Sequence, residues 1–189
     1  MYFKISGDQG GEPNVYIEPI NNEFACIQEG IIVDPEDQQI ELPFRFNMKV
    51  RQNPDATRQN PRLRSYNPAD ELMHKDLLRA IQAAGVDNLQ VFPAILSEKE
   101  SDILIEDYVV INVVGLVSCA AVDASDSIPF ADGLYFNKLV IDPAKTNGLL
   151  MFRLAESKMD VLIHESVAKI LMKGNFPYLV LTPLEQVSK

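Results

Sequence analysis

The chain has 189 residues, enough for one domain or for one domain with a lobe attached. Its 27 acidic and 17 basic side chains give a net charge of −10, which argues against a general nucleic-acid binder, because phosphate contacts need clustered Lys and Arg. No apolar run reaches the roughly 20 residues of a membrane span, and the N-terminus lacks the apolar core of a secretory signal. We therefore expect an acidic cytoplasmic protein with neither a nucleic-acid nor a membrane partner.

The first part of the chain, residues 1–50, has the pattern of a β-rich N-terminal lobe. Apolar and polar residues alternate strictly from Ile40 to Val50, which predicts a strand with one buried face. Pro43 cannot donate a hydrogen bond to a neighbouring strand, so this strand should be an edge strand or a bulged one. Shorter strands are expected at Tyr2–Ile5 and Val15–Glu18. An edge strand of this kind could pair across a dimer axis, so a homo-oligomer stays open.

A basic, proline-rich segment follows at residues 51–66. It holds Arg51, Arg58, Arg62 and Arg64 against the single acid Asp55, and it shows little periodicity. This composition predicts a linker between the N-terminal lobe and an α+β domain over residues 67–189.

Two helices are predicted in that domain, at about 67–84 and 165–172. Asn67 is a plausible N-cap with Pro68 at the first helical position, and the apolar stripe that starts at Met73 ends before Gly85. In the second helix Val167, Ile170 and Leu171 should face inward.

Strands dominate the rest of the sequence, and no internal repeat appears in it. The expected strands are Leu89–Leu96, Tyr108–Val117, Tyr135–Ile141, Leu149–Arg153, Asp160–Ile163 and Tyr178–Leu181. Because many strands follow one another with few helices between them, the fold class should be α+β, with a mixed, largely antiparallel sheet and two helices.

The sequence His164-Glu165-Ser166-Val167-Ala168 is the nearest approach to a metal-binding motif. A zinc protease needs a second histidine four residues after the first, and that position is Ala168. The other histidine, His74, lies in a different segment. We therefore expect no metal site and interpret His164 as a residue that caps or precedes the second helix.

Nucleophilic catalysis finds no support either. Ser118 follows Gly115 but lacks the second glycine of a nucleophile elbow. Cys26 and Cys119 both lie in apolar sequence, which predicts two reduced core residues. No phosphate-binding glycine loop is present, so we expect a protein without catalytic residues and without a cofactor.

Among the side chains that could carry a function, carboxylates are the most abundant, and they flank the long strand expected at 108–117 on both sides. A run of acidic residues on a loop is usually just a solvated surface. If it has a function, it forms a negatively charged patch that attracts a basic partner. The candidate partner-binding residues are Glu98, Glu100, Asp102, Glu106 and Asp107 before the strand, and Asp123 and Asp126 after it. The second group lacks the ligand register of an EF-hand.

Core segments between Tyr108 and Leu181 resemble a family of bacterial immunity proteins from polymorphic toxin systems, formerly a domain of unknown function. The matching segments are 108–114, 121–127, Lys138-Leu-Val-Ile-Asp142, Phe152-Arg-Leu154, 161–171 and 176–181. The resemblance implies a non-enzymatic protein that binds and neutralises a cognate toxin, with no active-site residues to transfer.

Two other readings remain open at this point. One is an accessory module that binds a small molecule or a peptide, which a concave polar pocket would favour. The other is a hydrolase in which Asp123, Asp126 and His164 converge in one cleft.

Overall fold

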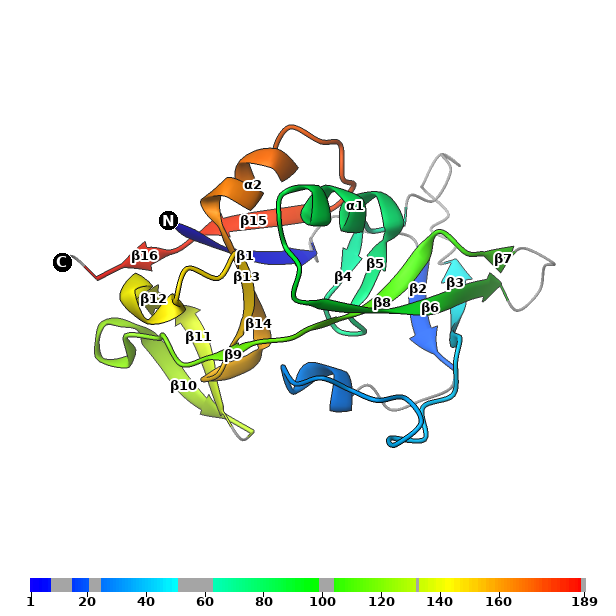
Figure 1. Cartoon of the computed structure of the whole chain (residues 1–189), viewed down its shortest axis with the longest axis horizontal. Helices are drawn as coiled ribbons and strands as arrows, with labels where there is room; N and C mark the ends of the chain where they lie inside the picture. Colours follow the sequence, from blue (N-terminus) through cyan, green and yellow to red (C-terminus); the bar gives the residue numbers. More distant parts are fainter. Residues whose placement is uncertain (8–14, 21–24, 51–62, 99–103, 132, 188–189) are drawn as a thin grey trace.

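The computed structural model describes residues 1–7, 15–20, 25–50, 63–98, 104–131 and 133–187. Within them the chain forms two large sheets, two small ones and two helices, α1 (Lys75–Ala83) and α2 (Glu165–Leu171), as Figure 1 shows. Most strand pairs are antiparallel and a few are parallel. The α+β class with a mixed, largely antiparallel sheet is thus confirmed.

The larger sheet occupies the right half of Figure 1, and β7 (Leu104–Ile105) pairs with its strand β6. In spatial order its strands are β2 (Val15–Pro19), β3 (Phe44–Val50), β6 (Leu89–Glu98), β8 (Tyr108–Val113), β5 (Leu72–His74) and β4 (Tyr66–Asn67). The second sheet has the order β15 (Leu179–Pro183), β1 (Tyr2–Gly7), β14 (Ser157–His164), β13 (Met151–Leu154) and β9 (Leu116–Val117).

Two small sheets and three short 3₁₀ helices complete the described fold. The sheets pair β10 (Asp126–Phe130) with β11 (Gly133–Lys138), and β12 (Val140–Ile141) with β16 (Glu185–Gln186). The 3₁₀ helices are η1 (Ala25–Gln28), η2 (Val122–Ala124) and η3 (Pro143–Thr146).

A separate N-terminal lobe over residues 1–50 is not confirmed. Strand β1 pairs with β14 and β15 of the C-terminal sheet, whereas β3 lies between β2 and β6 of the other sheet. Long-range pairing therefore divides this segment between both sheets. The expectation of an edge strand at 40–50 is wrong as well, because the strand begins only at Phe44, after Pro43. Of the expected linker at 51–66, residues 51–62 lie outside the described residues, and Tyr66 already belongs to β4 and is fully buried.

The first helix begins eight residues later than the sequence pattern predicts. Residues 66–74 form the β4–β5 hairpin instead, and Glu71 between the strands adopts a left-handed φ of 50°. The N-cap is His74, whose side chain accepts a hydrogen bond from the Asp76 N–H, so the prediction of Asn67 as N-cap is wrong. Long-range pairing of β5 with β8 overrides the local capping signal. The second helix matches its expected range, but Ile170, which was expected to face inward, is 41% exposed, and Ala168 is buried instead.

Although no repeat is visible in the sequence, each of the two large sheets contains the same structural unit. In the larger sheet the hairpin β4–β5 is followed by α1 and β6, and β8 lies between β5 and β6, antiparallel to both. In the second sheet the hairpin β13–β14 is followed by α2 and β15, and β1 lies between β14 and β15, antiparallel to both. In each unit a histidine caps the helix and faces a tyrosine of the inserted strand. The ring centroids of His74–Tyr108 and of His164–Tyr2 are both 5.1 Å apart.

The main core lies between the two repeated units, where both helices pack. Equivalent positions of the two helices are buried: Leu77, Leu78 and Ile81 in α1, and Val167, Ala168 and Leu171 in α2. At about 1.5–3 kcal/mol for each large side chain, this burial does more for the fold than the intrinsic propensity of such short helices.

Candidate functional site

The predicted acidic residues divide into two groups at opposite ends of the molecule. Glu98 ends β6, and the exposed Glu106 and Asp107 precede β8, on the right of Figure 1. Glu100 and Asp102 lie outside the described residues. The exposed Asp123 (in η2) and Asp126 (first in β10) lie on the left. The two groups therefore do not form one continuous patch.

The group at Asp123 and Asp126 adjoins an exposed apolar surface on the β10–β11 hairpin. Ile128 and Tyr135 are direct cross-strand partners, and Phe130 follows Ile128 on the same face. These side chains are 51%, 52% and 56% exposed, respectively. Gly133 is the cross-strand partner of Phe130, so no side chain on β11 covers the ring from there.

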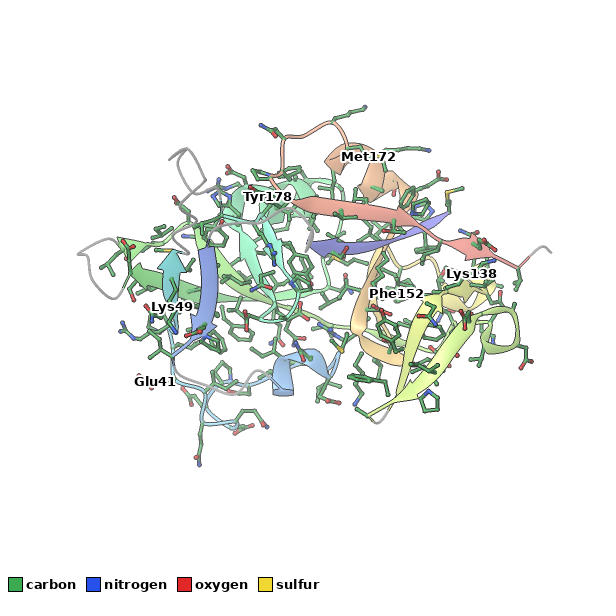
Figure 2. All side chains as sticks on the ribbon, turned by 180° about the vertical axis from the view of Figure 1, so that it is seen from behind. Glu41, Lys49, Lys138, Phe152, Met172 and Tyr178 are labelled. Carbon is green, nitrogen blue, oxygen red and sulfur yellow. The ribbon has the colours of Figure 1, made fainter. Side chains whose placement is uncertain are left out.

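The opposite face of the hairpin is packed against the protein. Phe136 is buried in a cluster that includes Phe152 of β13 and Leu139, and Leu134 packs against it. Phe152 is labelled in Figure 2, where it lies on β13 close to the hairpin. The hairpin is thus fixed from behind while Ile128, Phe130 and Tyr135, which we call the hairpin face, meet solvent.

The hairpin could have been found in the sequence. Asp132-Gly133 is a dipeptide typical of tight turns. Ile128 and Phe130 alternate before it, and the apolar residues 134–136 follow it directly. The prediction from the sequence used only the carboxylates of the segment from Asp123 to Ser127. The three apolar residues of the hairpin face were therefore missed as candidates.

The outer edge of β10 is closed to strand addition. The Leu134 N–H points away from β10 and donates to the Glu156 carbonyl at 2.7 Å. Leu134 and its partner Pro129 are therefore a non-hydrogen-bonded pair, in which the main-chain nitrogen of Pro129 faces outward. That nitrogen carries no hydrogen, so a ladder on this edge would lack a donor. A partner is left to bind through the side chains of the hairpin face.

Replacement of Pro129 by threonine should open this edge. The variant gains an outward N–H beside exposed apolar side chains, and we expect concentration-dependent self-association in light scattering, with wild type unchanged over the same range. Pro183→Thr, at the end of β15, is the matched control. A Pro129→Thr protein that behaves like wild type at every concentration would show that Pro129 does not guard the edge.

Both histidines have structural roles. His164 accepts from the Ser166 N–H and caps α2, as His74 caps α1. The His164 ring contacts Ser166 and Tyr2. Figure 1 shows α2 well apart from β10, which begins at Asp126 and follows the η2 residue Asp123. Over the described residues, no group of three His, Cys, Asp or Glu side chains could hold a metal ion. Likewise, none of the described helices is long and apolar enough to cross a membrane.

Cys119 is a free, buried thiol, as the sequence indicated, whereas the side chain of Cys26 lies outside the described residues. Burial raises the pKa of Cys119 to about 12, and the carboxylates of Glu156 and Asp142 add to the shift. The thiol is therefore protonated near neutral pH and is a poor nucleophile.

A Cys26→Ser protein, which keeps only Cys119, should react with an aromatic disulfide reagent very slowly while folded. In denaturant the same protein should release one equivalent of thiolate at once, because the unfolded thiol has an ordinary pKa. Absorbance of the released thiolate measures both rates. Rapid labelling of the folded protein would contradict the burial of Cys119.

Comparison of the sequence with protein-family models and with curated proteins gives no match. The assignment of a function therefore depends on the geometry of the fold and of the hairpin face.

Proposed function

We propose that this protein is a non-enzymatic binding protein of the immunity type, which neutralises a cognate protein toxin in the cytoplasm of the cell that makes it. The supporting observation is the hairpin face, with Ile128, Phe130 and Tyr135 each more than half exposed on a hairpin that is packed from behind. Exposed aromatic side chains on a rigid element are typical of the anchors that dominate protein–protein binding.

Charge complementarity favours a cationic toxin over a second copy of this chain. Asp123 and Asp126 stand beside the hairpin face, and the chain carries a net charge of −10. The one lysine of the hairpin, Lys138, is paired with Glu185 at 2.9 Å. Two copies would repel each other, whereas a basic partner would be attracted and would associate faster.

A growth-rescue screen tests this function. Open reading frames of the source genome are expressed one by one in a heterologous host, and those that arrest growth are repeated with this protein co-expressed. We expect it to restore growth for at least one basic protein and not for unrelated toxic clones. A complete screen in which it rescues none, or in which rescue needs no physical contact with the toxic product, would overturn the proposal.

A further inference from the structure

A second exposed apolar element lies in the segment that follows η1. Ile31 is 60% exposed and Ile32 is 74% exposed, more than any other large apolar side chain among the described residues. The next residue, Val33, is buried in the core beneath the larger sheet. Two isoleucines thus project into solvent from a segment that is anchored directly after them.

Two polar side chains of the larger sheet hold the backbone of this segment. Gln90 of β6 accepts from the Val33 N–H at 2.7 Å and donates to the Val33 carbonyl at 2.9 Å. Asn112 of β8 donates to the Ile31 carbonyl at 2.7 Å and to the Gln90 side chain at 2.8 Å. The backbone on both sides of Ile32 is therefore fixed by side chains from two neighbouring strands.

The start of the segment is fixed as well. The Gly30 carbonyl accepts from the Gly115 N–H at 2.8 Å, and Glu29 pairs with Lys158 of β14 at 2.6 Å. Lys158 lies on β14, which contacts β11 of the hairpin, and Gly115 directly precedes β9 of the same sheet. Figures 1 and 2 place η1, the segment after it and the β10–β11 hairpin along the same lower side of the molecule.

The hydrogen bonds of Gln90 and Asn112 to this segment, which we call the polar clamp, stabilise the fold less than apolar packing at the same place would. Asn112 is fully buried, and its Oδ1 has no hydrogen-bond partner among the described residues. An orphaned buried acceptor opposes folding, and apolar packing would avoid it. The polar clamp holds Ile31 and Ile32 in one exposed conformation. It therefore lowers the conformational entropy that this segment would lose when a partner binds.

We propose that Ile31 and Ile32 form a preformed anchor that inserts into an apolar recess of a basic protein partner, the same partner that contacts the hairpin face. The charges that follow the anchor select that chemistry: residues 34–41 contain Asp34, Glu36, Asp37 and Glu41 and no basic side chain. Glu29, before the anchor, is already paired with Lys158. Apolar anchors within an acidic rim complement an apolar recess within a basic rim. This inference rests on the proposed function and names a second contact of the same surface.

The test uses peptides selected from a random phage-displayed library on the wild-type protein. The selected peptides are titrated into protein labelled at isoleucine methyl groups, and into a variant with Ile31→Ser and Ile32→Ser. A Leu104→Ser variant is the matched control, because Leu104 is 64% exposed but lies in β7 near the other acidic group. Serine at these exposed positions leaves the core intact, which the unfolding transition of each variant verifies.

We expect peptides that combine Lys or Arg with apolar residues, shifts of the Ile31 and Ile32 methyl signals, and about a tenfold or larger loss of affinity in the double variant only. Recovery of no binding peptide, of peptides without basic residues, or of peptides that bind the double variant equally well would overturn the inference. The growth-rescue screen separates the two proposals. Rescue that is intact in the Ile31→Ser, Ile32→Ser variant would leave the function standing and remove the anchor.

Discussion

Replacement of Arg153 by leucine is expected to lower the free energy of unfolding by about 3–5 kcal/mol, the cost of leaving a buried charge without its counterion. Arg153 and Glu71 are both almost completely buried, and Arg153 Nη2 lies 2.7 Å from Glu71 Oε1. The Tyr66 hydroxyl donates to the other oxygen of Glu71 at 2.9 Å. Arg153 lies on β13 and Glu71 precedes β5, so the pair ties the two large sheets together.

The substitution should also strengthen the pH dependence that Glu71 gives to the stability. Burial already raises the pKa of Glu71 above its ordinary value of 4.5, and Arg153 opposes the shift by charge and by hydrogen bond. Loss of Arg153 raises the folded-state pKa further, so the folded state of the variant binds a proton more tightly than the unfolded state does. The contribution of Glu71 to the variant's stability should be largest below pH 4.5 and should be lost as the pH rises through the folded pKa.

Urea unfolding followed by circular dichroism measures both effects. Addition of Glu71→Gln to the Arg153→Leu variant removes the stranded charge and should recover part of the loss. Arg79→Leu is the control, because Arg79 pairs with Asp76 on the exposed surface of α1, where such pairs contribute little. A loss below about 1 kcal/mol for Arg153→Leu, or no recovery in the double variant, would show that the pair does not hold the sheets.

Replacement of Phe130 or Tyr135 by alanine is expected to weaken binding of the proposed toxin partner by about 30-fold or more each, the loss of about 2 kcal/mol typical of an aromatic anchor. Both side chains are more than half exposed in the free protein, so the unfolding transition should change little. Calorimetric titration of each variant with the toxin measures the affinity.

The matched control for Phe130→Ala is Met172→Ala. Met172 has the same exposed fraction, 56%, but caps the end of α2 on the opposite side of the molecule, as Figures 1 and 2 show. It should bind like wild type. Equal effects of the three substitutions, or none from Phe130 and Tyr135, would remove the hairpin face as the binding surface.

The sequence predicts the strands well where local periodicity decides the structure. Leu89–Leu96 lies within β6 as expected. The single strand expected at Tyr108–Val117 is instead divided at residues 114–115 into β8 of the larger sheet and β9 of the second sheet, a break that the apolar run does not reveal. The start of α1 is mispredicted because Asn67 and Pro68 carry strong capping signals. Their segment instead pairs with β5, which itself pairs with β8 from a distant part of the chain.

Other features depend on residues that are far apart in the chain. The repeated unit is hidden because one of its strands, β1, comes from the start of the chain, and because few residues match between the copies, such as His74 with His164. The Glu71–Arg153 pair joins residues separated by 82 positions. The clamp on Ile31 by Asn112 spans 81 positions, so no local pattern could reveal it.

The central claim, that a cationic protein binds the acidic and apolar lower side of this molecule, is tested most directly by titration with an inactivated form of the toxin that the screen identifies. We expect a stoichiometric complex whose affinity falls as salt is added. The double substitution Asp123→Lys, Asp126→Lys should lower the affinity further, since screening and charge reversal both remove the attraction. A rescued toxin that forms no complex with the purified protein, or one whose affinity responds neither to salt nor to these substitutions, would contradict it.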